Sequence, residues 1–123
     1  MNLLHNNTLG IDIGSTTVKI AVLDSEQHIL FTDYERHYAN IQETLALLLS
    51  KAKEKLGEMT VSPSITGSGG LTLSGHLNVP FTQEVVAVAT ALQDYAPQTD
   101  VAIELGGEDA KIIYFTGGID QRM

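Results

Sequence analysis

Two glycine turns, each close to acidic residues, are the parts of this chain best suited to chemistry. In the first, Asp12 lies near the end of an apolar run and Gly14-Ser15-Thr16 follows it. In the second, Gly106-Gly107 follows another apolar run and Asp109 comes two residues later. A carboxylate after a strand can hold a hydrated metal ion, and a glycine turn lets backbone N–H groups approach phosphate oxygens. The two turns together predict the two halves of a nucleotide clamp.

The size and charge of the chain narrow the classes of protein it can be. With 123 residues, 43% of them hydrophobic, it has the size and composition of one soluble globular domain. The formal net charge of −8 at pH 7 argues against a nucleic-acid or anionic-membrane surface, because such surfaces need clustered lysine and arginine. The sequence has no signal-peptide pattern and no apolar run near the ~20 residues of a membrane span, so we expect a cytoplasmic protein.

Cysteine and histidine suggest no separate site. The chain has no cysteine, so this sequence offers no disulfide, thiolate metal site or cysteine nucleophile. The four histidines are His5, His28, His37 and His76, and their spacing is not that of metal ligands. We expect each of them at the surface or at the edge of a strand.

The beginning of the chain predicts three strands in a row. Residues 9–13 and 17–23 are apolar runs joined by the first glycine turn. Residues 27–38 follow a second polar turn and form a third run. Three consecutive strands joined by short turns are typical of an antiparallel meander.

Residues 40–56 give the clearest helix prediction. Apolar side chains recur there at spacings of three and four residues, which places them on one helix face. Asn40 together with Glu43 resembles a capping box at the start of the helix, and Gly57 provides its stop.

The rest of the chain predicts alternating elements and then a repeat of the opening pattern. In order, we expect a buried strand at 61–66, a short helix ending near His76, an extended piece at 79–81, a helix at 84–95, a linker at 96–100, and strands at 101–105 and 111–115. The helix at 84–95 is apolar almost all round, which is typical of a helix inside a larger assembly. The final strand–turn–strand repeats the start of the chain, so we expect two lobes of one design.

Three segments carry a resemblance to a known family. They are residues 9–19 (LGIDIGSTTVK), 66–70 (TGSGG) and 103–112 (IELGGEDAKI). With the order of elements over nearly the whole chain, they resemble the actin-like ATPase superfamily, which includes heat-shock chaperones and sugar kinases. Within it the chain is most similar to the ATPase activators of 2-hydroxyacyl-CoA dehydratases and the related ATPase subunits of benzoyl-CoA reductases. The resemblance implies an α/β fold, with a ribonuclease H-like lobe of mixed sheet and flanking helices at residues 1–97 and the first hairpin of a second lobe at 98–123.

The resemblance also implies roles for individual residues. Asp12 is the implied ligand of Mg²⁺, and the implied binders of the ATP phosphates are Gly14, Ser15, Thr16, Thr17, Lys19, Gly106 and Gly107. Glu84 and Asp109 are the implied catalytic residues. A carboxylate such as that of Glu84 can orient water for in-line attack on a phosphate.

For two side chains and one segment, a structural interpretation stays open as well as the functional one. Lys19 points either toward the phosphates or outward from its strand. Glu84 is either catalytic or simply a favourable acid in the first turn of a helix. The glycines of residues 66–70 either correspond to the family's Thr-Gly-x-Gly segment or, as we favour, serve a tight turn before the next helix.

Two acidic residues depart from the family pattern. Glu104 stands where relatives usually carry aspartate, and Glu108 where activators often carry glutamine, which leaves ATPase competence open. The family's cluster-ligating cysteines follow the second phosphate loop, and this chain stops before them. We therefore expect an N-terminal fragment of a longer protein, whose iron–sulfur cluster has no ligands in this chain.

For the parent protein, the resemblance implies ATP binding and hydrolysis that drive electron transfer to a CoA-ester dehydratase or reductase. We expect the fragment itself to be inactive, because half of a clamp cannot close. Unpaired strand edges on its last hairpin favour a homo-oligomer. Two other classes stay open: a small-molecule kinase of the same superfamily, and a degenerate nucleotide-sensing or interaction domain.

Overall fold

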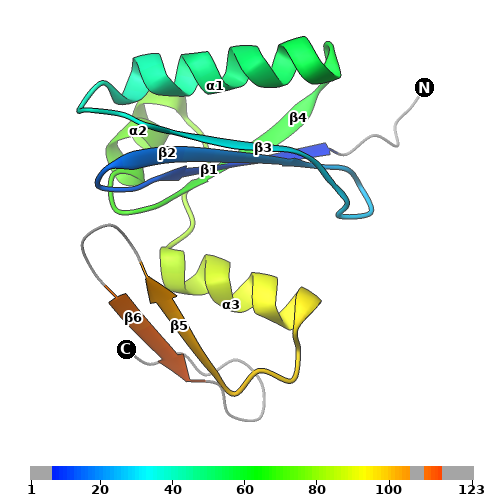
Figure 1. Cartoon of the computed structure of the whole chain (residues 1–123), viewed down its shortest axis with the longest axis vertical. Helices are drawn as coiled ribbons and strands as arrows, with labels where there is room; N and C mark the ends of the chain where they lie inside the picture. Colours follow the sequence, from blue (N-terminus) through cyan, green and yellow to red (C-terminus); the bar gives the residue numbers. More distant parts are fainter. Residues whose placement is uncertain (1–6, 106–109, 115–123) are drawn as a thin grey trace. The chain divides into compact units, whose positions relative to one another are not determined.

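The chain forms two compact units in the computed structural model, which describes residues 7–105 and 110–114. The units are residues 1–81 and 82–123. In chain order the elements are β1 (Asn7–Ile13), β2 (Thr17–Leu23), β3 (Ile29–Arg36), α1 (Ile41–Leu56), β4 (Val61–Thr66), α2 (Gly70–Leu77), α3 (Glu84–Tyr95), β5 (Val101–Leu105) and β6 (Ala110–Tyr114) (Figure 1). The compact units divide before α3, whereas the expected domain boundary follows it, and the domain limits stay a prediction.

A four-stranded mixed sheet in the order β3-β2-β1-β4 is the frame of the first unit. β1 with β2 and β2 with β3 are antiparallel, as the meander pattern predicts, whereas β4 pairs with β1 in parallel. In this register Lys19 of β2 and Thr66 of β4 both lie beside Asp12 of β1. Paired residues project to the same face of a sheet. The three side chains therefore share one face at one end of the sheet.

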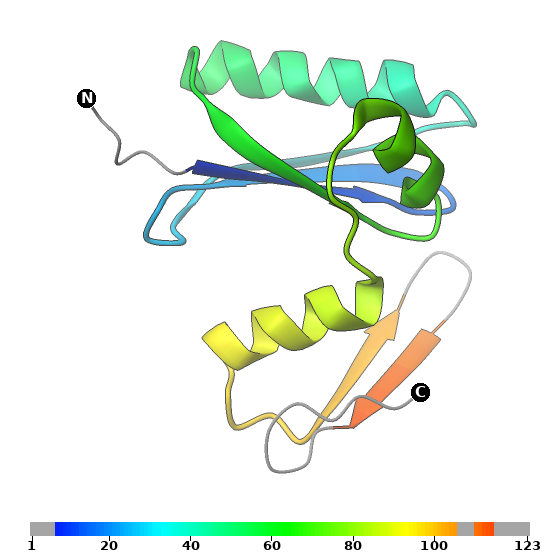
Figure 2. The same ribbon diagram turned by 180° about the vertical axis from the view of Figure 1, so that it is seen from behind.

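The opposite face of the sheet carries the core and is covered by helices. Burial alternates along β1, where Leu9, Ile11 and Ile13 are the buried residues. Their partners in the core are Val18, Ile20, Val22, Leu45, Leu48, Ala52, Ile65 and Leu73. These residues come from the strands and from α1 and α2, and both views show α1 lying along this face (Figures 1 and 2). The alternation sends every second residue, Asp12 among them, to the face away from the core.

The helix α1 ends as the sequence predicts but does not begin with the expected capping box. Gly57 has φ +78°, and its N–H donates to Lys53 O at 2.8 Å. Asn40 makes no side-chain capping bond, and its carbonyl oxygen accepts instead from Thr44 N–H and from Thr44 Oγ1–H. The reason is a tight turn just before the helix, in which Asn40 N–H donates to His37 O at 2.6 Å. That turn leaves Asn40 at ψ 68°, away from the extended backbone of a capping residue.

The segment after α1 follows the sequence prediction closely. The expected strand and short helix form as β4 and α2, and Figure 2 shows β4 leading into α2. The extended piece at 79–81 adds a parallel bridge between Ile65 and Phe81, beside a bond from Ile65 N–H to Pro80 O at 2.9 Å.

The second unit contains α3 and the antiparallel hairpin of β5 and β6. The hairpin pairs Val101 with Tyr114 and Leu105 with Ala110, so the two strands of the repeated pattern are confirmed. Ala89 is the buried residue of α3 in the described chain, and Val86 and Tyr95 are exposed. The expectation that α3 belongs inside a larger assembly stays a prediction. Across the described residues, the helices are too short or too polar to serve as a membrane span.

Candidate functional site

The turn between β1 and β2 is closed by its own backbone. Gly14 N–H donates to Thr17 O at 2.8 Å, which closes the Gly14-Ser15-Thr16 turn between the two strands. A Cβ atom added to Gly14 would lie 3.5 Å from Thr17 O, an ordinary contact, and Gly14 is not among the positive-φ residues. Within the described chain, therefore, neither packing nor backbone conformation requires glycine at position 14. Close approach of a ligand would require it.

The Asp12 carboxylate lies near this turn on the face away from the core. Its side chain is 35% exposed, and Lys19 Nζ lies 3.9 Å from Asp12 Oδ2. Lys19 lies on the Asp12 face, which is also the exposed face of the sheet, so both interpretations of Lys19 stay open. The lysine side chain is 54% exposed, and exposed ion pairs contribute about 0–1 kcal/mol. The ammonium group can therefore turn to another anion at little cost.

A second glycine segment packs directly against the end of β1. Gly69 N–H donates to Ile13 O at 2.8 Å. Gly67 has φ +101°, and a Cβ atom added there would lie 2.5 Å from Asp12 Oδ1 and would overlap the Ile13 carbonyl. The segment therefore makes the tight turn that we favoured from the sequence. It also contacts the Asp12 carboxylate, a contact that the sequence does not reveal.

Thr66 places a hydroxyl group at the same end of the sheet. Among the described residues, its Oγ1 is the buried side-chain polar atom that lacks a hydrogen-bond partner. Leaving such an atom unsatisfied costs about 1–3 kcal/mol. Because Thr66 pairs in register with Asp12, the unsatisfied hydroxyl belongs to the candidate site.

His37 is the residue of this region that sequence reasoning missed. The expectation of a surface position is wrong for His37, which directly follows the edge strand β3 but has an exposed fraction of only 7%. Its ring Nε2 lies 3.0 Å from Gly14 O, and its backbone N–H donates to Thr16 O at 2.9 Å. The chain turns sharply after β3, with positive φ at Tyr38 and Ala39. The buried ring lies against the glycine turn, whose residues are distant in the sequence.

The residues present fit a magnesium–nucleotide complex better than a dedicated metal cage. In the part of the chain that the structure describes, no three histidine, cysteine, aspartate or glutamate side chains gather into a metal site. Mg²⁺ is commonly bound through one or two carboxylates, with the remaining positions filled by waters and substrate phosphates. A carboxylate such as that of Asp12, next to a glycine turn, suits this mode of binding.

The other residues implied by the resemblance lie outside the described residues or in the second unit. Gly106, Gly107 and Asp109 lie outside the described residues. Glu84 begins α3 in the second unit. Their roles stay predictions, as do the roles of all the residues of the first site: Asp12, Gly14, Ser15, Thr16, Thr17 and Lys19.

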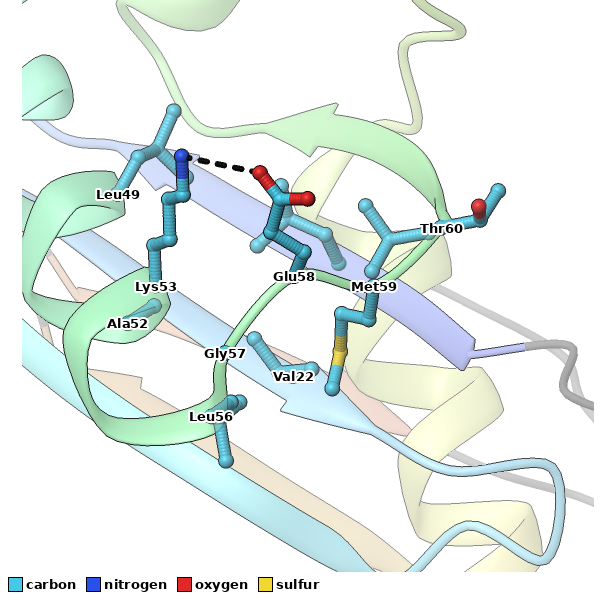
Figure 3. A pocket seen from close by; sticks show the side chains of 11 residues that line it. Val22, Leu49, Ala52, Lys53, Leu56, Gly57, Glu58, Met59 and Thr60 are labelled. Carbon is cyan, nitrogen blue, oxygen red and sulfur yellow. Dashed lines mark ion pairs between the residues drawn. The ribbon is translucent and has the colours of Figure 1, made fainter.

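A different hollow lies near the other end of β1 (Figure 3). It has a volume of about 510 Å³, with apolar walls that include Leu9, Leu56 and Val61. The Lys53 ammonium and the Glu58 carboxylate on its rim pair at 3.4 Å. Because these two charges neutralise each other and the walls are mostly apolar, this hollow is poorly suited to phosphate.

Several solved structures share the fold of this chain. Component A of (R)-2-hydroxyglutaryl-CoA dehydratase from Acidaminococcus fermentans has a TM-score of 0.72 and 23% identity, covering 93% of this chain and 44% of that one. The activator of 2-hydroxyisocaproyl-CoA dehydratase from Clostridium difficile, with bound ADPNP, has a TM-score of 0.74 and 23% identity. The match covers 92% of this chain and 43% of the activator. A ROK family glucokinase from Streptomyces griseus, in complex with glucose and AMPPNP, has a TM-score of 0.62 and 21% identity. The match covers 95% of this chain and 46% of the glucokinase.

These similarities confirm the expected α/β fold, which is that of actin-like ATPases and sugar kinases. They also confirm, at the level of the fold, the resemblance to dehydratase activators. The chain spans less than half the length of these three proteins. No family model and no curated protein matches the sequence.

Proposed function

We propose that this chain forms the phosphate-binding lobe of an ATPase that activates a CoA-ester dehydratase or reductase. The observation that carries the proposal is the end of β1, where the Asp12 carboxylate lies near a turn whose Gly14 is not required by packing. Thr66 pairs in register with Asp12 on the same face. The dehydratase activator with bound ADPNP and the glucokinase with AMPPNP support a nucleotide as that ligand.

In this proposal the first turn and its neighbours bind the phosphates. The backbone N–H groups of Ser15 and Thr16 donate to phosphate oxygens, and Lys19 adds a positive charge. Asp12 holds Mg²⁺, which when bound neutralises phosphate charge. Because phosphoryl transfer needs little covalent chemistry from the protein, these residues act by positioning and electrostatics.

Residues beyond the first turn complete the proposed site. Gly106 and Gly107 form the opposing phosphate loop, and Asp109 adds a carboxylate to the cleft. Glu84, in the first turn of α3, orients the attacking water. Each of these assignments depends on the resemblance to the activators and not on a measured distance.

The proposed activity of the whole protein extends beyond this chain. ATP hydrolysis would be coupled to electron transfer to the CoA-ester enzyme; an iron–sulfur cluster would supply that redox chemistry, and this cysteine-free chain has no ligands for it. We place the protein in the cytoplasm and expect it to act as a homo-oligomer.

A small-molecule kinase is the second candidate function, because a glucokinase shares the fold. Both candidates predict nucleotide binding at the Asp12 turn, so binding alone does not separate them. A chain extended through the second lobe separates them by its products. An activator releases phosphate to water and supports its dehydratase, whereas a kinase transfers phosphate to a hydroxyl of a second substrate.

The first experiment is calorimetric titration of the chain with ADPNP and Mg²⁺. We expect saturable binding that falls roughly tenfold or more in Asp12→Asn, since changes around a metal ligand commonly cost 10–100-fold. Glu54→Gln is the matched control, because it removes one carboxylate from an exposed position of α1 in the same unit.

Two results contradict the proposal. Equal affinity of the wild type and Asp12→Asn would remove Asp12 from the site. Absence of binding both in this chain and in one extended through the second lobe would refute nucleotide binding altogether.

A further inference from the structure

Both ring nitrogens of the buried His37 side chain are engaged by backbone groups. Nδ1 lies 3.0 Å from the backbone nitrogen of Ala39 and accepts its N–H. Nε2 lies 3.0 Å from Gly14 O. A carbonyl oxygen can only accept, so Nε2 must carry the proton and Nδ1 must be the unprotonated nitrogen. The contacts thus select the neutral Nε2–H tautomer.

The two carbonyl groups that His37 holds belong to the candidate phosphate turn. The ring fixes Gly14 O, and the backbone N–H of His37 fixes Thr16 O at 2.9 Å. In a planar trans peptide the C=O and the following N–H point in opposite directions. Holding Gly14 O toward His37 therefore turns the N–H of Ser15 away from the ring. The same geometry turns the N–H of Thr17 away from the His37 backbone.

The backbone after His37 adopts an unusual conformation that keeps the ring in place. Tyr38 and Ala39 have φ of +46° and +68°, values that residues with a Cβ atom seldom adopt because they cost about 1–2 kcal/mol each. The same turn brings Ala39 N–H to Nδ1 and Asn40 N–H to His37 O. Such strain persists only where surrounding contacts impose it, and it is concentrated at functional sites.

We propose that His37 is a positioning residue, whose ring Nε2–H orients the Ser15 amide toward a bound phosphate. The inference rests on the proposed function for the identity of the ligand, and it adds a residue outside the three sequence motifs. His37 contacts the Gly14 and Thr16 carbonyl groups of the turn and need not touch the nucleotide. Its effect is to hold the amide in the binding orientation before the ligand arrives, which removes an ordering cost from binding.

Two conservative substitutions separate this role from simple filling of the core. In His37→Gln, the side-chain amide nitrogen lies about as far along the side chain as Nε2 and can still donate to Gly14 O. In His37→Asn, the shorter amide can accept from Ala39 N–H, as Nδ1 does, but cannot reach Gly14 O. The backbone bond from residue 37 to Thr16 is available in both variants.

The test compares ADPNP affinity in the two variants, under conditions where circular dichroism shows both to be folded. We expect His37→Gln to bind within about twofold of the wild type. We expect His37→Asn to bind about fivefold more weakly, the order of one hydrogen bond's net contribution. Equal affinity in the two variants would overturn the proposal, and so would weaker binding by His37→Gln.

A nucleotide-free measurement keeps the inference separate from the proposed function. We expect ¹⁵N NMR of the wild-type ring to show His37 as the neutral Nε2–H tautomer, with the exposed His28 as the internal reference. The Ser15 amide resonance should move in His37→Asn and stay near its wild-type position in His37→Gln. An Nδ1–H tautomer would refute the positioning role even if ADPNP binds. A Ser15 amide resonance that moves in neither variant would refute it as well. Failure of ADPNP to bind, with these NMR results intact, would instead count against the proposed function.

Discussion

Replacing Gly67 with alanine tests whether the second glycine segment is packed as tightly on Asp12 as the structure shows. The position combines two separate obstacles to a side chain. Its φ of +101° is a conformation that L residues rarely adopt, and the added Cβ would lie 2.5 Å from Asp12 Oδ1. It would also overlap the backbone carbonyl of Ile13, which cannot move aside without displacing the end of β1.

The expected magnitude follows from the two obstacles taken in turn. A residue with a Cβ atom at such a φ costs about 1–3 kcal/mol. Forcing extra atoms into a filled space typically costs a further ~1–3 kcal/mol. We therefore expect Gly67→Ala to lower the free energy of unfolding by about 2–6 kcal/mol, a large part of the ~5–15 kcal/mol available to a domain.

Two other glycines of the same unit provide matched controls. Gly57 has φ +78° with no atom within 4 Å of an added Cβ, so Gly57→Ala carries only the conformational cost. Gly75 lies in α2 with neither a positive φ nor a neighbour within 4 Å. Gly75→Ala should therefore stabilise the chain, by about 0.5–1 kcal/mol.

Urea unfolding followed by circular dichroism measures all three variants on one scale. The comparison is valid where the slopes of the transitions agree, because the slope reports the surface exposed on unfolding. A Gly67→Ala variant no less stable than Gly57→Ala would refute the packing of this segment against β1.

Two further predictions concern the β2–β3 turn and the core. The Asp24 carboxylate accepts from the backbone N–H groups of His28 and Glu26, and the His28 bond is the main cause that lowers the pKa of Asp24 below its ordinary 3.8. Asp24→Ala should therefore lower the urea midpoint at neutral pH, and its difference from the wild type should shrink as the pH falls from 3.8 through the lowered pKa. A difference that grew on acidification would contradict this assignment. In α1, Leu48 is 0% exposed and Leu47 is 48% exposed. Leu48→Ala should therefore lower the free energy of unfolding by about 2–5 kcal/mol, and Leu47→Ala by less than about 0.5 kcal/mol. Similar losses in the two variants would contradict the orientation of α1 on the sheet.

The elements of the first unit were predictable because their signals are local. The apolar runs on either side of the first glycine turn have the alternation and spacing of a hairpin, and β1 and β2 form there. Gly57 marks the end of α1 for an equally local reason, since glycine takes a positive φ without a steric penalty.

The surroundings of Asp12 could not be predicted in the same way because they depend on pairing between distant segments. Only the parallel register of β4 on β1 brings Thr66 and Gly67 to the carboxylate. His37 gives no local sign of its burial, because the carbonyl that its ring binds belongs to Gly14, which lies 23 residues earlier in the sequence. The capping-box prediction failed because Asn40 takes part in the tight turn that begins at His37.

The parallel pairing of β1 with β4 also has a consequence for the order of folding. The β1–β2–β3 meander pairs neighbours in sequence, whereas the β1–β4 ladder closes a long loop that includes α1. Pairings of long sequence separation are slow, because the chain loses the entropy of the whole loop before it gains the contacts. We therefore expect Asp12 and its turn to form with the meander, and the segment from Thr66 to Gly69 to join them only when the ladder closes. A ligand that needs both parts should slow unfolding while leaving the folding rate nearly unchanged.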